Sequence, residues 1–275
     1  MDTHAEPRRL PTLYIPHGGG PCFFMDPPAQ APQAWDAMAA YLRGLAPSLA
    51  QRPRAILVVS AHWEAPLPTV MASPRPPMRF DYFGFPPHTY ELSYPAPGSP
   101  ALAARVRALL AEAGIDSAED AARGFDHGVF VPFLLAFPDA DIPVVQLSLQ
   151  VGLDPARHLA IGRALAPLRD DGVLIVGSGM SYHDLRGFFS ADAGVAADAA
   201  RFDAALAEAV GQADPRERDA RLADWQALPA ARRCHPREEH LLPLMVAAGA
   251  AGSDRGRRSY GERVFGKAVS AFRFG

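Results

Sequence analysis

The sequence predicts an α/β fold: a single catalytic domain, residues 1–275, whose central mostly parallel or mixed sheet is covered by helices on both faces. Three observations predict it. Short β-branched runs alternate along the chain with alanine-rich amphipathic stretches. Several of these runs are almost continuously apolar, as strands covered on both faces should be, and prolines stand where many amphipathic stretches begin.

The strands are expected where short β-branched and apolar runs are bounded by turn-forming residues. In chain order they cover residues 13–15, 55–60, 69–72, 144–149, 173–176 and 267–272. The sheet built from them would place helices on either side of most strands.

The helices are expected where apolar residues recur at helical spacing. In chain order they cover residues 31–45, 100–113, 129–137, 155–168, 191–212, 215–228 and 236–248. Pro100, Pro155, Pro215 and Pro236 stand at or just inside four helix starts. Ser99, Asp154 and Asp214 precede three of these prolines and are natural N-caps.

One segment, residues 73–98, is rich in proline and aromatic residues, and its apolar residues show neither helical nor strand spacing. We expect it to form a long loop or hairpin near the functional site.

Composition excludes other classes of protein. With 49% hydrophobic and 21% charged residues the chain is not disordered, and a formal charge of -3 disfavours a nucleic-acid-binding stripe.

Two cysteines, Cys22 and Cys234, cannot form the framework of a disulfide-stapled domain. No segment approaches roughly 18 uninterrupted apolar residues, and the first residues lack the apolar run of a signal peptide. We therefore expect a cytoplasmic protein that binds neither membranes nor nucleic acid. The sequence does not indicate an oligomeric state.

Five of the nine histidines share a placement beside an expected strand end or helix start, in a small or glycine-rich context. They are His17 in IPHGGGP, His62 in VVSAHWE, His127 in GFDHGVF, His183 in GSGMSYHDL and His240 in HPREEHLLPL. Ligands of open α/β sheets bind outside the carboxyl ends of the strands, so these histidines can converge. Histidine is also the commonest metal ligand, which predicts a shared metal site.

The other four histidines carry weaker signals. We expect His4, His158 and His235 to be solvated surface residues, whereas His88 lies in the aromatic segment 73–98. A zinc pair of Cys234 with His235 lacks a partner CxxC motif.

The motifs HGGGP, SAHW, YPAPG, DHG, GSG and EHLLPL occur in this order between His17 and about Gly249. In this combination the chain resembles the class III extradiol ring-cleavage dioxygenases of the LigB-like superfamily, and within it the 4,5-DOPA dioxygenase group. The resemblance implies a non-haem Fe(II) enzyme that opens the ring of a small aromatic diol with dioxygen, and the expected substrates are catechol-type compounds, DOPA-like ones among them. Zn(II) occupies the site in some members.

The resemblance also implies roles for the histidines. His17, His62 and His240 are the implied metal ligands, and His183 is a fourth ligand or a base beside the metal. His127 is implied to be an acid or a hydrogen-bond donor to substrate or oxygen. Both His127 and His183 are thus catalytic candidates, because imidazole titrates near neutrality.

The third ligand could be Glu239 or His240, since relatives that cleave protocatechuate use a glutamate there. On a helix that begins near Pro236, adjacent residues point about 100 degrees apart, so only one can face the metal. The resemblance favours His240 and leaves Glu239 to hydrogen-bond a ligand histidine. Asp126 and Asp184 flank the catalytic candidates and could orient their rings or serve ordinary capping roles.

Aromatic side chains could line a site for a flat ring, with Phe23 and Tyr94 as the foremost candidates. The others are Phe24, Tyr82, Phe83, Phe85 and Tyr90. No lysine or arginine is placed by a motif to pair with an amino-acid carboxylate.

Two other functions compete with ring cleavage. A zinc hydrolase could use Glu239 as its base, although no HExxH motif is present. A non-enzymatic metal-binding member of the same superfamily would be expected to have lost some of the five histidines. Ser178 fails the GxSxG pattern of a serine nucleophile.

Overall fold

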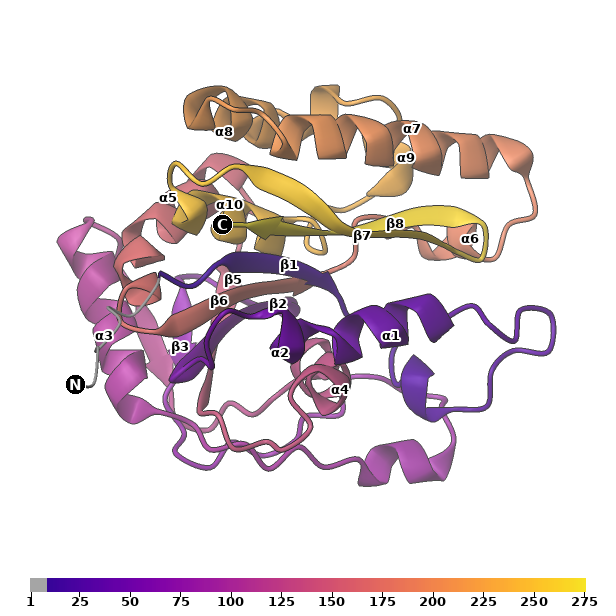
Figure 1. The fold of residues 1–275 in the computed structure, drawn as a ribbon. Coiled ribbons are helices and arrows are strands. Elements are labelled where there is room, and N and C mark those ends of the chain that lie inside the picture. The colour runs from indigo at the N-terminus through magenta and orange to yellow at the C-terminus, as the bar shows by residue number, and fades with distance from the viewer. Residues whose placement is uncertain (1–8) are drawn as a thin grey trace, which may run out of the picture.

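A mixed eight-stranded sheet forms the centre of the computed structural model, which describes residues 9–275 (Figure 1). The strand order is β4-β3-β5-β2-β6-β1-β8-β7. The strands are β1 (Thr12–Pro16), β2 (Ala55–Ala65), β3 (Thr69–Met71), β4 (Ala118–Asp120), β5 (Val144–Gln150), β6 (Val173–Gly179), β7 (Gly256–Val264) and β8 (Lys267–Phe274). The four central strands β5, β2, β6 and β1 run parallel, whereas β3 and β8 join them antiparallel. The α/β prediction with a mixed sheet is confirmed.

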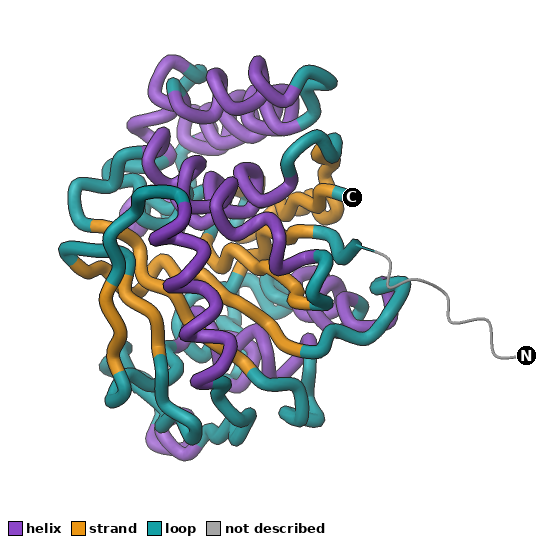
Figure 2. The backbone as a smooth tube through the Cα atoms, turned by 90° about the vertical axis from the view of Figure 1, so that its left-hand side faces the viewer, coloured by secondary structure: helices purple, strands orange, loops and turns teal. Residues whose placement is uncertain are grey.

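The central strands are buried on both faces, as their apolar sequences require. Ile56 and Val58 of β2 belong to one buried cluster, whereas the alternate residues Leu57 and Val59 belong to another. The first cluster is closed by α1 (Asp36–Arg43), α4 (His127–Ala136) and α7 (Ala193–Val210). The second is closed by α3 (Pro100–Glu112) and α5 (Pro155–Leu165), and Figure 2 shows helices lying across the strands from that side.

Five further α-helices complete the layers around the sheet. They are α2 (Leu45–Ser48), α6 (Leu185–Phe188), α8 (Pro215–Ala223), α9 (Ala231–Cys234) and α10 (Leu242–Ala251). Helix α10 is buried along its whole length and packs between α5 and the strands β1 and β6. Helices α7 and α8 form an outer layer beyond the β7–β8 hairpin (Figure 1).

Three of the predicted helix starts are confirmed with their caps. The side chain of Ser99 accepts a hydrogen bond from the backbone of Leu102, and Asp154 and Asp214 accept from the first turns of α5 and α8. Each cap satisfies a backbone N–H that has no partner within the helix.

Three expected helices differ clearly in their bounds, and the one expected over 215–228 ends at Ala223. The stretch 31–45 is helical only from Asp36, and Gly44 separates α1 from α2. The helix expected over 236–248 begins at Leu242 instead. The reason is Pro243, which would break the interior of a helix begun at Pro236 but fits the first turn of α10.

Two strands were missed. Strand β7 carries exposed charged residues at four of its nine positions, because it is an edge strand paired only with β8. Strand β4 has three residues and pairs only with β3 at the opposite edge. Neither has the apolar content that marks a buried strand.

Candidate metal centre and active site

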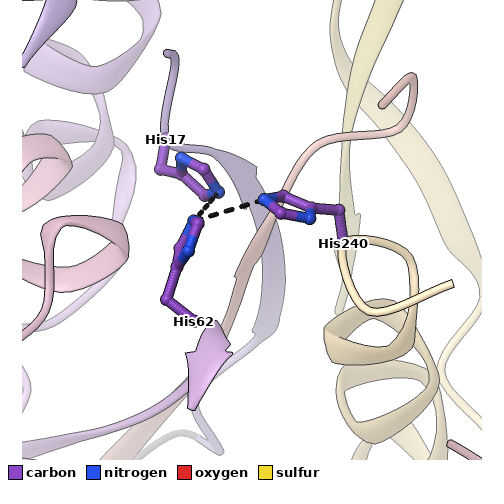
Figure 3. A group of neighbouring side chains, drawn as sticks. All are labelled: His17, His62 and His240. Carbon is purple, nitrogen blue, oxygen red and sulfur yellow. Dashed lines mark hydrogen bonds between the residues drawn. The ribbon is translucent and has the colours of Figure 1, made fainter. Parts of the chain in front are cut away.

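Three histidines converge beside the carboxyl ends of the central strands (Figure 3). His17 directly follows β1, His62 lies in β2, and His240 comes two residues before α10. The Nε2 atom of His62 lies 3.3 Å from Nε2 of His17 and 3.2 Å from Nε2 of His240. Strands β1 and β2 run parallel on either side of β6, so their carboxyl ends bring residues 17 and 62 together.

A register shift positions the side chain of His62, and two hydrogen bonds to its backbone position His240. The pairing of β2 with β5 shifts register between Val59 and Glu64, and His62 lies within that shift. The carbonyl of His240 accepts hydrogen bonds from the hydroxyl of Tyr14 (2.6 Å) and the backbone N–H of Met180 (3.2 Å). These bonds fasten the segment before α10 to the ends of β1 and β6.

The three imidazoles suit a divalent metal ion. His17 and His240 are almost fully buried, and burial, reinforced by the neighbouring histidines, holds the pKa values of all three well below their ordinary value. The rings are therefore neutral and offer lone pairs. Zinc–nitrogen distances of 2.0–2.1 Å around a tetrahedral ion place two nitrogens about 3.3 Å apart, which matches the spacing of these Nε2 atoms.

Glu239 lies behind the triad. Its Oε1 accepts a hydrogen bond from Nδ1 of His240 at 2.9 Å and lies 3.3 Å from Nδ1 of His183. The ring of His183 stacks on that of His240, with centroids 3.3 Å apart and an interplanar angle of 14°. The structure thus brings His183 into a cluster with Glu239 and His240, whereas the triad itself is His17, His62 and His240.

The argument that placed residues 239 and 240 on one helix was wrong, because both precede α10. His240 nevertheless points its Nε2 at the triad, and Glu239 contacts the opposite nitrogen of that ring. The pKa of Glu239 is lowered despite its burial, since His183, its own backbone and Arg237 favour the carboxylate.

Sequence reasoning missed Asp81. Its Oδ1 accepts hydrogen bonds from Nδ1 (2.8 Å) and the backbone N–H (3.0 Å) of His127, at the start of α4. Its Oδ2 lies 3.6 Å from Nδ1 of His62, whose ring centroid is 3.8 Å from that of His127. Burial raises the pKa of Asp81, but the hydrogen bonds and charge of His127 outweigh it, so the net shift is downward. Asp81 lies within segment 73–98, where an acidic residue among aromatic ones was the only signal.

Asp126 does not orient the ring of His127. It is fully buried and accepts hydrogen bonds from Ser60 (2.7 Å), Arg123 (2.6 Å) and Gln146. Burial, followed by the charge of Asp81, raises its pKa. Asp184 caps α6 by accepting from the backbone of Arg186 and Gly187, so it has the capping role.

The aromatic candidates divide between core and site. Tyr94 is fully buried and packs edge-on against Phe125 and Phe133, so the structure places it in the core rather than in a site lining. Phe23 is half-buried and contacts Trp35. Of the remaining candidates, Phe85 lines a cavity beside His183, Tyr82 lies against His127, and Phe83 is exposed. Phe24 and Tyr90 are partly buried against the main core cluster.

The expectation that His158 and His235 are solvated was wrong. His158 is buried and donates from Nδ1 to the carbonyl of Asp154, while its Nε2 accepts from the backbone of Gln150. His235 is fully buried and donates from Nε2 to the carbonyl of Ser181. Both are core histidines, and neither belongs to a metal-binding cluster among the residues 9–275.

The other minor candidates also have structural explanations. His88 is exposed and its Nε2 lies 2.9 Å from the carbonyl of Phe24. Cys234 is buried, and burial raises the pKa of its thiol to about 12. The hydroxyl of Ser178 is buried and donates to the carbonyl of Gly128, so it is not available as a nucleophile. His4 lies outside the described residues.

Comparison with known proteins agrees with this geometry. The family described as the catalytic LigB subunit of aromatic ring-opening dioxygenase matches residues 11–271. The chain belongs to the LigB family. It is therefore an extradiol aromatic ring-opening dioxygenase, which acts on an aromatic substrate and dioxygen and depends on a metal ion.

Relatives in several kingdoms support the assignment. The chain is 43% identical to 4,5-DOPA dioxygenase extradiol of Beta vulgaris over 78% of this chain and 84% of that one. It is 36% identical to dioxygenase tasH of Hapsidospora irregularis, over 96% of this chain and 85% of that one. A crystal structure of an uncharacterized protein from Escherichia coli K12 superposes with a TM-score of 0.77 at 29% identity, covering 97% of this chain and all of that one.

No helix within residues 9–275 is both long enough and apolar enough to cross a bilayer.

Proposed function

We propose that this LigB-family enzyme is an Fe(II)-dependent extradiol dioxygenase that opens the ring of a catechol-type substrate. The observation that supports it is the convergence of three neutral Nε2 atoms 3.2 and 3.3 Å apart. His17, His62 and His240 would hold the ion. A bound ferrous ion supplies the redox couple and the vacant coordination positions that the reaction needs, whereas zinc has no accessible redox couple.

The overall reaction needs no further reductant. The carbon–carbon bond beside the diol breaks, and both atoms of dioxygen enter the product, which is an acid and an aldehyde or ketone on the opened chain. The catechol ring supplies the electrons that reduce dioxygen. The protein must take a proton from the diol and return one later, which suits two histidines.

We assign the movement of these protons to His183 and His127. The Nδ1 of His183 lies 3.3 Å from Glu239 and that of His127 donates to Asp81, so the Nε2 of each ring remains for the substrate. We assign His183 as the base, since its ring stacks on His240. We assign His127 as the acid or hydrogen-bond donor on the side of His62, whose ring it contacts.

Anaerobic reconstitution tests the proposal. The protein loaded with Fe(II) is mixed with catechol, and labelled dioxygen is then admitted. We expect a visible absorbance from the ring-opened semialdehyde, with both labelled oxygen atoms in the product, and no such product from protein loaded with zinc. Hydrolysis of ester or amide substrates by the zinc form without dioxygen would support the competing hydrolase instead.

The His62→Ala variant is the test of the ligand set. We expect it to lose stoichiometric Fe(II) binding, because His62 contacts both other ligands. His88→Ala is the matched control, since His88 is exposed and lies outside the triad. Undiminished iron binding by the His62 variant would overturn the assignment.

A further inference from the structure

An apolar cavity of about 420 Å³ reaches the site at His183 and at the glycines that follow the triad member His17. The three glycines that follow His17, Gly18 to Gly20, form one wall, and His183 forms another. The ring of His183 stacks on the triad member His240. A diol held at the triad would have this cavity beside it, through His183 and the glycines, to receive its ring and any substituent.

Large apolar side chains make up most of the lining. The chief ones are Met25, Trp35, Phe85, Phe188, Phe189 and Phe265. These come from separate parts of the chain, and the rings of Phe189 and Phe265 lie 5.1 Å apart. Such a lining favours an apolar occupant, because it removes apolar surface from water on both sides.

Charge in this cavity disfavours an anion. Among its described lining residues there is no lysine or arginine, and the one carboxylate, Asp26, is exposed at the rim. Cys22 also lines the cavity, and burial raises the pKa of its thiol to about 12, so it is neutral. A substrate carboxylate placed here would lose hydration without gaining a cationic partner, which is costly.

The cations near the site line a second cavity, of about 700 Å³, which His183 also lines. They are Arg186, Arg232, Arg233 and Arg237. Three of the four already pair with carboxylates, in order Glu238 (2.6 Å), Asp198 (2.8 Å) and Glu64 (2.6 Å). Among the described residues, only the exposed Arg186 of these four has no carboxylate within ion-pair distance.

We propose that the enzyme selects catechols whose ring substituent is uncharged and apolar, and that it discriminates against a carboxylate there. This inference rests on the proposed function, because it takes the diol to be held at the triad. It sets this chain apart from an enzyme built for an amino-acid substrate.

Binding to the zinc-loaded protein tests the proposal without turnover. Calorimetry compares 4-propylcatechol with 3-(3,4-dihydroxyphenyl)propionate, which differ at the end of the substituent, where a methyl group replaces a carboxylate. 3-Phenylpropionate, which has the carboxylate and no diol, reports binding through the carboxylate alone. We expect 4-propylcatechol to bind at least about tenfold more tightly. Equal binding, or tighter binding of the propionate, would overturn the proposal.

A pair of exposed phenylalanines provides matched variants. Phe189 lines the apolar cavity and Phe83 does not, and both side chains are mostly exposed. Phe189→Arg should narrow the preference for 4-propylcatechol about threefold by offering the carboxylate a partner, and Phe83→Arg should leave it unchanged. Equal effects of the two variants would contradict the assignment of this cavity.

Turnover of the Fe(II) form separates the two proposals. If neither catechol is opened but 4-propylcatechol still binds more tightly, the proposed function fails and the selectivity stands. If both are opened and the propionate has the higher kcat/KM, the proposed function stands and the selectivity fails.

Discussion

Replacing Glu239 by glutamine should weaken metal binding without unfolding the protein. Glu239 Oε1 accepts from Nδ1 of His240 at 2.9 Å, and a carboxylate partner fixes the ring and increases the basicity of the nitrogen that binds the metal. Loss of such a partner typically costs 10- to 100-fold in metal affinity, or about 1.4–2.7 kcal/mol. Glutamine can still accept one neutral hydrogen bond, so we expect about tenfold for Glu239→Gln and about 100-fold for Glu239→Ala.

The assay is competition with a chromophoric zinc chelator, and the free energy of unfolding of the metal-free protein shows whether the fold is intact. Glu238→Gln is the matched control, because Glu238 pairs with Arg232 at 2.6 Å. Arg237 keeps both hydrogen bonds to Glu64 when Glu239 is changed, so the local surface should persist. Zinc affinities of both Glu239 variants within twofold of the parent would refute the reasoning.

Three further outcomes are expected. Asp81→Ala, which removes the acceptor of His127 Nδ1, should lower zinc affinity about tenfold and release the fixed tautomer of His127, which nitrogen NMR of the metal-free protein reports; an unchanged tautomer would contradict the role of Asp81. Gly179→Ala should lower both the Tm and zinc affinity, because its Cβ would overlap the carbonyl oxygen of His240, and parent-like values would argue against this contact. Burial lowers the pKa of His235 from 6.5 to about 4, so the unfolded state gains a proton first as the pH falls, and His235 should cost about 3 kcal/mol of stability between pH 6.5 and pH 4. Denaturant unfolding measures this, and the free energy of unfolding of His235→Gln should fall less steeply than that of the parent as the pH falls through this window. Parallel plots of unfolding free energy against pH would show that His235 does not contribute.

The fold was predictable where the sequence signal is local. Strand β6 begins with the continuous apolar run 173–176, and the Ser99 and Asp154 caps satisfy helix donors within three residues of themselves. Strand β7 was not predicted, because an edge strand that pairs on one side only does not need an apolar run. The start of α10 was predictable in retrospect, since Pro243 tolerates only the first turn.

The part of the site that lies at the carboxyl ends of parallel strands was predictable from the sequence. His17 and His62 converge because parallel strands end at a common edge, and that rule does not need the loops. Asp81 could not be predicted, because segment 73–98 has no periodicity and its course is set by tertiary contacts. Adjacency in sequence pointed to Asp126 instead, which the structure commits to Ser60, Arg123 and Gln146.

The two carboxylates of the site have equivalent positions. Asp81 contacts the triad member His62 and also His127, and Glu239 contacts the triad member His240 and also His183. Under the proposed assignment, each carboxylate would hold one ring toward the metal ion and a second ring toward the substrate beside it. A change at either carboxylate should thus affect metal affinity and proton transfer together.

His17 is positioned by backbone rather than by a carboxylate. Its backbone N–H donates to the carbonyl of Gly179 at 3.2 Å. The next residue, Gly18, has a φ of +82°, a backbone conformation that is strained for a residue with a side chain. A Cβ at Gly18 would also overlap the sulfur of Cys22. Substitution of Gly18 should therefore weaken metal binding through His17 alone and leave the tautomers of His127 and His183 fixed. The two kinds of support can in this way be separated by NMR of the metal-free protein.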